Sequence, residues 1–280
     1  MAARLFAALQ YVLPKFLMTA LIYRIARIRH PGFKNGLITR FVDAYNVDVD
    51  DIDASVPDDF ATFNDFFIRE LKDGARPIDA DPNSIVSPAD GRLSQFGTIT
   101  DGTLVQAKGR NYRVDELVAV DLPTAAAFDG GQFATIYLAP FNYHRVHSPV
   151  DGTLVAAHYV PGDLFSVNAA TARYVPGLFR RNERLNLHIQ TAGGRCMLSL
   201  VGALNVGSIS TPWTGEIRPQ SKGVVETFTL DSHPVDLKKG DLLGWFNMGS
   251  TVVMLTQDVD FDDLAQDATV RMGERLGQRG

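Results

Sequence analysis

The step Gly249-Ser250-Thr251, at the start of an apolar and strand-like run, offers chemistry that a chain can perform on itself. A serine hydroxyl that follows glycine can attack the preceding carbonyl, because glycine lacks a Cβ and tolerates a strained backbone. The amide would become an ester, and β-elimination of that ester would cut the chain and leave a pyruvoyl group on the new N-terminus. An isolated Gly-Ser-Thr is more commonly a strand with a glycine bulge and surface hydroxyls. The choice between this interpretation and self-cleavage therefore depends on other residues of the chain.

Two histidines are the first candidates for acid–base chemistry. His144 and His147 lie in one stretch, residues 141–149, and positions three apart in an extended chain point to opposite faces. The two side chains could therefore serve different tasks. A coincidental pair on a polar loop, or a weak metal site, would explain the same pattern. A metal site needs a third and a fourth ligand, however, and none has a suitable spacing.

A turn of the form Pro-x-Asp-Gly occurs twice, in residues 88–91 and 149–152, each time after a serine and before a strand-like stretch. Proline presets φ and glycine accepts a positive φ, as a tight turn requires. The repeat predicts a barrel or sandwich built from related halves. Asp90 and Asp151 hold equivalent places, and most aspartates before glycine cap such a turn, so position alone does not separate them.

Composition limits the compartment and the partners. The 280 residues are 45% hydrophobic, enough to bury a substantial core. Cys196 is the one cysteine, which excludes an internal disulfide and makes the cytosolic side the default. Residues 1–40 carry seven Lys or Arg and no acid, whereas the remainder has a charge of −12 within a net −5. That asymmetry calls for a local explanation. We expect no nucleic-acid partner.

The basic N-terminal segment predicts two amphipathic helices on a membrane surface. Its apolar stripes lie on either side of Pro14, which breaks the first helix. The uninterrupted apolar runs are far below the roughly 20 residues of a membrane span, and a basic, acid-free pair suits anionic lipid. The alternative is a pair of helices packed on the protein's own core. The stripes are Leu5, Phe6, Leu9, Val12 and Leu13, then Phe16, Leu17, Leu21, Ile25 and Ile28.

The remaining pattern predicts an α+β, mainly β fold, with a barrel-like core preceded by helices. Further helices are expected over residues 36–46 and 59–72, with an exposed acidic linker, residues 48–53, between them. From about residue 84 short strands alternate with Gly and Pro turns, and residues 258–280 read as polar and partly helical. We divide the chain into segments 1–46, 47–83 and 84–280. Strands are expected over residues 103–107, 133–138, 154–159, 185–190, 197–201, 224–230 and 251–256.

Nine stretches together resemble the bacterial phosphatidylserine decarboxylases, which are pyruvoyl-dependent enzymes. Many members have Leu where this chain has Met248, a change that conserves volume and apolarity. Each stretch alone is weak, but their order and number make the resemblance specific. The stretches are residues 62–71 (TFNDFFIREL), 76–78 (RPI), 88–91 (PADG), 106–109 (QAKG), 143–149 (YHRVHSP), 160–168 (VPGDLFSVN), 181–184 (RNER), 201–203 (VGA) and 249–251 (GST).

The resemblance implies cleavage between Gly249 and Ser250, into a β chain of residues 1–249 and an α chain of residues 250–280 that begins with the pyruvoyl group. Ser250 would be the nucleophile and pyruvoyl precursor. His147, oriented by Asp90, would be the base that activates its hydroxyl. His144 would act in decarboxylation, as a proton donor or a substrate-positioning group. Ser166 is a further candidate for contacting the head group.

The reaction implied is conversion of phosphatidylserine to phosphatidylethanolamine and CO2. The pyruvoyl ketone would form a Schiff base with the substrate amine and delocalise the carbanion, so we expect neither a metal nor pyridoxal phosphate. A diacyl lipid stays in the bilayer, which implies a peripheral protein on the cytoplasmic face of the cell membrane, bound to an anionic phospholipid surface. The partners expected are this surface, the substrate, and the α and β chains of one precursor. A homodimer stays open.

Two functions of other classes fit part of the pattern. Asp90, His147 and Ser250 could form the triad of a serine hydrolase, although the Gly-x-Ser-x-Gly elbow is missing. Trapping with borohydride and substrate would separate a decarboxylase from a hydrolase. A non-enzymatic carrier-like β domain would also contain Pro-x-Asp-Gly turns. It would need a lysine beside methionine on an exposed hairpin, which the sequence does not offer.

Overall fold

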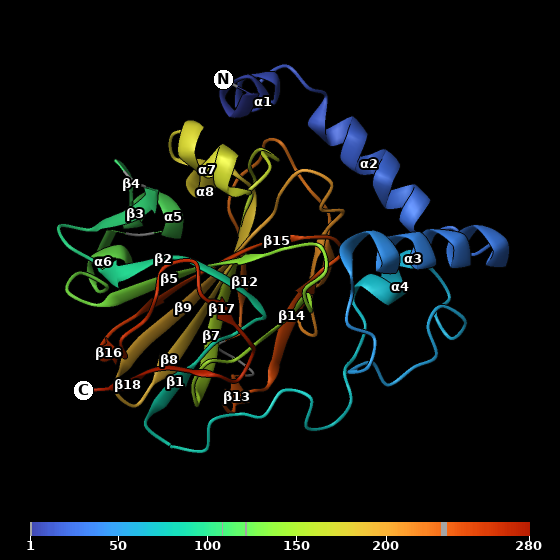
Figure 1. Cartoon of the computed structure of the whole chain (residues 1–280). Helices are drawn as coiled ribbons and strands as arrows, with labels where there is room; N and C mark the ends of the chain where they lie inside the picture. Colours follow the sequence, from blue (N-terminus) through green and yellow to red (C-terminus); the bar gives the residue numbers. More distant parts are fainter. Residues whose placement is uncertain (1, 108, 121, 231–233) are drawn as a thin grey trace.

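The computed structural model describes residues 2–107, 109–120, 122–230 and 234–280, and places the N-terminal helices along one side of a body made mostly of strands (Figure 1). The helices are α1 (Ala2–Leu9), α2 (Lys15–Ala26), α3 (Pro31–Tyr45), α4 (Phe63–Phe67), α5 (Val114–Val118), α6 (Leu122–Ala126), α7 (Ala169–Tyr174) and α8 (Leu178–Arg181).

The strands begin after the fourth helix. They are β1 (Ser84–Val86), β2 (Gly91–Thr98), β3 (Thr103–Ala107), β4 (Arg110–Arg113), β5 (Gln132–Leu138), β6 (Arg145–His147), β7 (Gly152–Val160), β8 (Arg184–Thr191), β9 (Gly194–Val201), β10 (Ile209–Thr211), β11 (Gly215–Ile217), β12 (Glu226–Thr229), β13 (Val235–Leu237), β14 (Leu242–Phe246), β15 (Ser250–Thr256), β16 (Val259–Phe261), β17 (Thr269–Val270) and β18 (Arg275–Arg279).

The core is a nine-stranded antiparallel sheet in the order β12-β7-β8-β9-β15-β5-β2-β17, with β13 also paired to β7. Every residue of the central strand β15 is buried, as expected for a strand covered on both faces. The α+β, mainly β class is confirmed, but the described strands do not close into a barrel. The edge strand β17 has only two residues, and the chain leaves it to build a separate sheet, β1-β18-β16.

The strands predicted from the sequence are confirmed with small shifts at their ends. β3 has the predicted bounds, and β5, β7, β8, β9 and β15 each contain the predicted range. The range 224–230 shortens to β12. The segment 258–280 is not partly helical: it forms β16, β17 and β18. β18 pairs with β16 and with the distant β1, and β17 pairs with the distant β2. The polar character of residues 258–280 carries no information about strand partners that are distant in the sequence.

The two Pro-x-Asp-Gly turns have the same structure, which supports the expected related halves. Ser87 and Ser148 each donate a hydrogen bond from the hydroxyl to the carbonyl two residues ahead, at 2.8 and 2.7 Å. Gly91 and Gly152 each lie against the neighbouring strand, where a Cβ would stand 2.6 Å from a backbone oxygen. A glycine is therefore required at both positions by close packing.

A pair of backbone hydrogen bonds joins the two halves. The Val86 N–H donates to the Pro149 carbonyl at 3.1 Å, and the His147 N–H donates to the Pro88 carbonyl at 2.8 Å. Each half therefore binds the turn of the other half. Because His147 is one of the donors, this exchange brings it beside the turn that contains Asp90.

The N-terminal helices form a second, smaller core. The predicted helix 36–46 is longer and begins at Pro31, after His30, whose Nδ1 accepts from the Phe33 N–H at 3.4 Å. The predicted helix 59–72 shrinks to α4, because Leu71 leaves the helix to form a β-bridge with Ile52. Buried residues of this core are Ala26, Ile38, Val47, Ile52, Phe63, Phe66 and Phe67, and Met248 packs against them.

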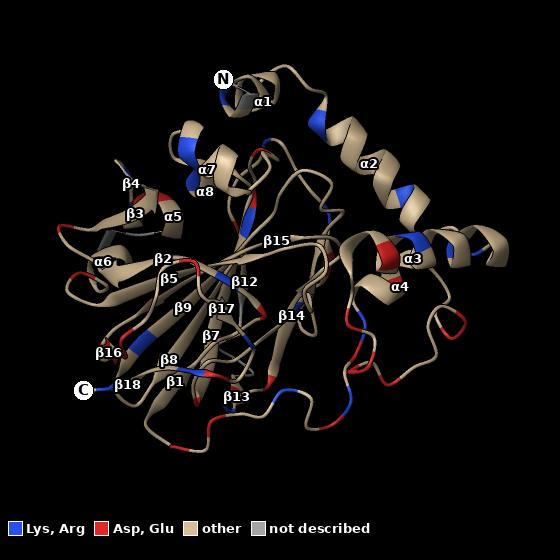
Figure 2. Ribbon diagram, in the orientation of Figure 1, with Lys and Arg blue, Asp and Glu red and all other residues tan. Residues whose placement is uncertain are grey.

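The apolar stripes of α1 and α2 face outward. Leu5, Val12 and Leu17 are 71%, 77% and 70% exposed, whereas the polar Gln10 and Lys15 are buried. Lys15 Nζ pairs with an Asp163 carboxylate oxygen at 2.9 Å. Figure 2 marks in blue where basic residues lie along the ribbon of these helices. Among the described residues, no helix combines the length and apolarity needed to cross a bilayer.

Candidate active site

The peptide between Gly249 and Ser250 lies where β15 begins, against a cavity of about 230 Å³ lined by both residues. Met248, just before it, has a φ of 149°, a region that residues with a Cβ rarely adopt, at a typical cost of about 1–3 kcal/mol. Gly249 is not among the glycines with positive φ, so the strain expected there lies one residue earlier. Ser250 is 1% exposed, and its hydroxyl has no hydrogen-bond partner among the described residues.

His144 is the histidine beside this peptide. Its Nδ1 lies 2.8 Å from the carbonyl of Asn142, and because a carbonyl only accepts, Nδ1 carries the hydrogen. The other nitrogen, Nε2, is then an acceptor, and it has no partner among the described residues. A Cβ on Gly249 would stand 3.4 Å from this nitrogen. The absence of a side chain at Gly249 therefore leaves Nε2 of His144 next to the backbone of the Gly249-Ser250 step.

Burial keeps His144 uncharged. Desolvation lowers its pKa to about 3, and the positive charge of Arg69 adds to the effect. Arg69 also donates hydrogen bonds to the carbonyls of Phe141 and Asn142, at 2.9 and 3.3 Å, so it fixes the loop that orients the ring. The imidazole is therefore a neutral acceptor across the whole working pH range.

His147 occupies a different environment. Its Nδ1 donates to the Gly240 carbonyl at 2.8 Å, and its Nε2 accepts from the Tyr143 hydroxyl at 3.0 Å. Burial lowers the pKa of His147, an effect that the bond to Gly240 partly offsets. Burial raises the pKa of Tyr143 to about 12, so this hydroxyl keeps its proton. The basic nitrogen of His147 is thus occupied by a neutral donor.

Asp90 is held by an arginine that sequence reasoning missed. The Nε of Arg76 lies 2.9 and 3.0 Å from the two Asp90 oxygens, its Nη2 donates at 2.7 Å, and the Met272 N–H donates at 2.9 Å. Arg76 also pairs with Asp51 at 2.7 Å. The linker 48–53 was expected to be exposed, but Asp51 makes this ion pair and Ile52 is buried.

The structure distinguishes the two turn aspartates that the sequence left equivalent. Both cap a later turn through the backbone, since Met272 N–H donates to Asp90 and Lys239 N–H donates to Asp151. The Asp90 side chain is only 7% exposed, whereas that of Asp151 is 54% exposed. Only Asp90 therefore carries a buried ion pair next to His147.

The predicted triad is brought together in part. Asp90 does not hydrogen-bond to His147 in the described chain: its partners are Arg76 and Met272, and the Gly240 carbonyl orients the histidine. The negative charge of Asp90 still acts at longer range and raises the pKa of His147. The Ser250 hydroxyl lacks a partner, so the Asp90-His147-Ser250 relay of a serine hydrolase is not assembled here.

Asn247 is a further positioning residue that the sequence did not indicate. Its Nδ2 donates to the hydroxyls of Ser208 and Ser210 at 2.8 and 2.9 Å, and its Oδ1 accepts from Asn64 at 3.0 Å. This network connects α4 to the segment just before the strained Met248. Asn64 and Arg69 lie in the stretch 62–71, which offered the only available signal.

Ser166 lines the same cavity as Ser250, as a head-group contact would require. Its backbone N–H donates to Oε1 of Gln10 at 2.7 Å, so the turn that follows α1 is tied directly to the wall of this cavity. Lys108, in the stretch 106–109, and His233 lie outside the described residues. Among the described residues, no cluster of three or more His, Cys, Asp or Glu could hold a metal ion.

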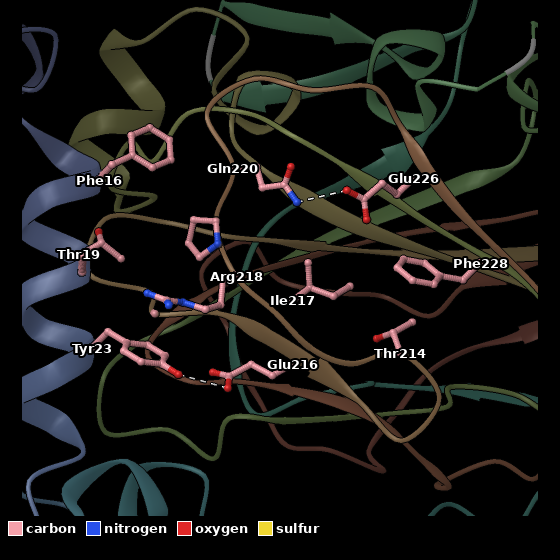
Figure 3. Close-up of a pocket in the computed structure, with 13 residues that line it drawn as sticks. Phe16, Thr19, Tyr23, Thr214, Glu216, Ile217, Arg218, Gln220, Glu226 and Phe228 are labelled. Atoms are coloured by element: carbon pink, nitrogen blue, oxygen red, sulfur yellow. Dashed lines mark hydrogen bonds between the residues drawn. The ribbon is translucent and has the colours of Figure 1, made fainter.

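A larger cavity, of about 610 Å³, lies between α2 and the segment around β11 (Figure 3). Tyr23 lies beneath the guanidinium groups of Arg27 and Arg218, and its hydroxyl donates to Glu216 at 3.2 Å. On the opposite wall Gln220 donates to Glu226 at 3.1 Å. This cavity shares no lining residue with the one at Ser250.

Comparison with known proteins identifies the class to which the chain belongs. A family model described as phosphatidylserine decarboxylase matches residues 63–278, and a second model, described as PSD, matches residues 5–46. The chain belongs to the phosphatidylserine decarboxylase family.

Individual relatives agree over nearly the whole length. A phosphatidylserine decarboxylase proenzyme of Bordetella pertussis is 46% identical over 98% of this chain and 94% of its own. Proenzymes of the same name from Methylococcus capsulatus and Aliivibrio fischeri are 46% and 45% identical, over 90% and 98% of this chain and 88% and 97% of their own.

The buried pair Arg76–Asp90 gives a prediction about stability. Arg76→Met should lower the free energy of unfolding by about 3–5 kcal/mol, because it leaves Asp90 buried without its counter-ion. Urea unfolding, followed by intrinsic fluorescence, measures the change. Arg113→Met is the matched control, since that side chain is 60% exposed in its pair with Asp115 and should change stability little. Equal midpoints for the two variants would contradict the role of Arg76.

Proposed function

We propose that this chain converts phosphatidylserine into phosphatidylethanolamine and CO2, after cutting itself between Gly249 and Ser250 into a β chain, 1–249, and an α chain, 250–280. The observation that supports this most directly is the buried Ser250 hydroxyl, without a partner among the described residues, behind the strained Met248 peptide. The chain belongs to the decarboxylase family, and its relatives are proenzymes. The Ser250 hydroxyl would therefore be the nucleophile of self-cleavage.

In maturation, Ser250 supplies the attacking oxygen and His147 is the base, in the field of Asp90. The accepting Nε2 of His147 is occupied by the Tyr143 hydroxyl in this structure, so it must exchange that partner for the proton of Ser250. Strain at Met248 raises the free energy of the uncut chain and favours the attack.

One observation favours the opposite assignment of the histidines. The neutral Nε2 of His144, rather than that of His147, faces Gly249. In this second assignment His144 takes the proton of Ser250, and His147 acts only after cleavage. The two assignments make opposite predictions for single variants, which the second experiment below separates.

In decarboxylation, the pyruvoyl group at position 250 supplies an electron sink for the loss of CO2. The residues fit such a group, because Ser250 begins β15, pairs with Leu138 and lines the cavity. His144 orients the substrate through its accepting nitrogen, and Ser166 contacts the head group from the same cavity. Burial of His144 and Ser250 excludes bulk water from the reacting centre.

The substrate is held at a membrane, and the outward-facing stripes of α1 and α2 supply the contact surface. Leu5, Val12, Leu17 and Leu21 are all more than half exposed, and Arg4 and Arg24 are exposed beside them. Exposed apolar side chains between basic ones suit an anionic lipid interface on the cytoplasmic face of the cell membrane. Association into a homodimer stays a prediction, which light scattering would test.

The first prediction concerns self-cleavage. Wild-type protein should run as two chains on a denaturing gel, with the smaller containing 31 residues (250–280), blocked at its N-terminus by intact mass. Ser250→Ala should stay one chain and release no CO2, because it lacks the attacking oxygen. Ser55→Ala, an exposed serine, is the matched control and should cleave normally. A cut Ser250→Ala chain would point to an outside protease.

The second prediction separates the histidines. His147→Ala and Asp90→Asn should both remain uncut, whereas His144→Ala should cleave and then decarboxylate about 10²-fold or more slowly, a typical loss for a catalytic side chain. The gel reports cleavage, and CO2 release from phosphatidylserine vesicles reports turnover. An uncut His144→Ala together with a cleaved His147→Ala would support the opposite assignment. If His144→Ala and His147→Ala both remain uncut, the two histidines do not have separate roles in cleavage and decarboxylation.

The third prediction concerns the membrane surface. The double variant Leu17→Glu, Leu21→Glu should bind phosphatidylserine vesicles at least tenfold more weakly, because each buried leucine is worth about 1.5–3 kcal/mol. Vesicle sedimentation measures binding, and added salt should weaken wild-type binding by screening. Val224→Glu, an 80% exposed valine outside these helices, is the control. Unchanged binding by the double variant would show that the apolar stripes do not mediate membrane binding.

A further inference from the structure

Glu183 and Ser250 lie in one row across the central sheet, with Gly202 between them. Val201 of β9 pairs with Arg184 on one side and with Thr251 on the other. Extending both registers by one residue, just past the ends of β8 and β9, places Gly202 between Glu183 and Ser250. The Gly202 N–H donates to the Glu183 carbonyl at 2.9 Å, as this extension requires. Residues opposite one another on antiparallel strands point to the same face of the sheet.

The missing side chain of Gly202 makes room for the Glu183 carboxyl group. A Cβ built on Gly202 would stand 2.6 Å from Oε1 of Glu183 and 2.7 Å from its Cγ. The carboxyl group therefore lies over the glycine, on the face that Ser250 shares. Cβ atoms of facing residues on adjacent strands are about 4.5–5.5 Å apart, so the acid is about one strand spacing from Ser250.

The carboxyl group is buried and only half satisfied. Glu183 is 1% exposed, its Oε2 accepts from the Tyr159 hydroxyl at 2.7 Å, and its Oε1 has no partner among the described residues. Burial raises the pKa of Glu183 to about 7, although the bond from Tyr159 works in the opposite direction. Near neutral pH the group is therefore an acid with a proton to give.

The charged groups around Glu183 are paired with other residues, so the Glu183 carboxyl group can keep its proton. Its own backbone N–H donates to the Asp163 carbonyl, and the Asp163 carboxylate is paired with Lys15. Beyond Tyr159, the Gln220 N–H donates to the tyrosine hydroxyl, and the Gln220 side chain binds Glu226 at the cavity of Figure 3. Within the described chain, none of the ion pairs involves the Glu183 carboxyl group.

His144 does not fill the same role. Its Nδ1 hydrogen is committed to the Asn142 carbonyl, and its Nε2 is an acceptor, so the ring presents a lone pair and not a proton to Ser250. A decarboxylase needs a proton donor, because CO2 departs without the electron pair of the bond that breaks. The neutral His144 orients the substrate, and a different group must supply the proton.

We propose that Glu183 is the catalytic acid that protonates the α-carbon of the substrate after CO2 leaves, an inference that rests on the proposed decarboxylase function. The bond between the α-carbon and the carboxylate breaks, and its electron pair stays with the substrate. The Oε1 proton of Glu183 then forms the new C–H bond, which leaves a carboxylate. Water returns a proton to Glu183 before the next turnover.

Glu183→Gln tests this role with almost no change of volume. The amide oxygen can still accept from Tyr159, so the chain should fold and cleave like wild type, which a denaturing gel and thermal unfolding check. CO2 release at pH 7 should fall about 10²- to 10⁴-fold in kcat, the usual range for a general acid, with little change in KM. A cleaved variant with wild-type kcat would overturn the proposal. Wild-type protein that releases no CO2 from phosphatidylserine would instead overturn the proposed function.

The pH profile gives an independent readout. The protonated acid is the active form, so wild-type kcat should be full below a pH of about 7 and fall as the pH rises through it. Tyr159→Phe removes a bond that lowers the pKa, so the fall should move to higher pH while neutral activity remains. Tyr112→Phe, another buried tyrosine, is the control and should leave the profile in place. If Tyr159→Phe does not shift the pH at which kcat falls, Glu183 is not the catalytic acid.

Discussion

The exchange of two backbone hydrogen bonds between the repeated turns is the constraint on which the site depends. Val86 binds the Pro149 carbonyl, and His147 binds the Pro88 carbonyl. Both donors and both acceptors are backbone groups, so the exchange survives most side-chain changes but requires the turns themselves. Close packing at Gly91 and Gly152 then holds each turn against its strand. Asp90 and His147, far apart in the chain, become neighbours for this reason.

Burial controls the charge of the side chains around the two hydrogen-bonded turns and Ser250. Desolvation lowers the pKa of both His144 and His147, so both rings are uncharged at neutral pH, and it raises the pKa of Glu183 to about 7, so about half of this group keeps its proton there. Asp90 is the contrast, because Arg76 neutralises its charge within a buried ion pair. A site built of neutral acceptors and one neutral acid is well suited to moving single protons without attracting water.

The N-terminal helices are connected to the reacting centre as well as to the outer surface. Met248, the strained residue before the Gly249-Ser250 peptide, packs against the core of α3 and α4. Gln10, in the turn after α1, accepts a hydrogen bond from the Ser166 backbone at the cavity wall. The N-terminal segment, which includes the helices proposed to contact lipid, therefore also contacts two sides of the cavity at Ser250. A substrate that stays in the bilayer would reach Ser250 close to the same elements that hold the protein there.

The sequence by itself determined the elements and the candidate residues. Strand-like stretches between glycine and proline turns predicted β3, β5, β7, β8, β9 and β15. The repeated Pro-x-Asp-Gly predicted two related halves, and Gly249-Ser250 indicated a candidate cleavage site. These signals are local, since each depends on residues a few positions apart. They also fixed a family resemblance that the comparisons confirmed.

Only the tertiary structure decided which atoms meet. It placed Arg76 rather than His147 on Asp90, moved the strain from Gly249 to Met248, turned residues 258–280 into strands and laid Glu183 over Gly202. Each of these depends on strand register and burial between segments many residues apart. A pattern along the chain carries no record of such partners, because register is set by the whole sheet and desolvation by everything packed around a group.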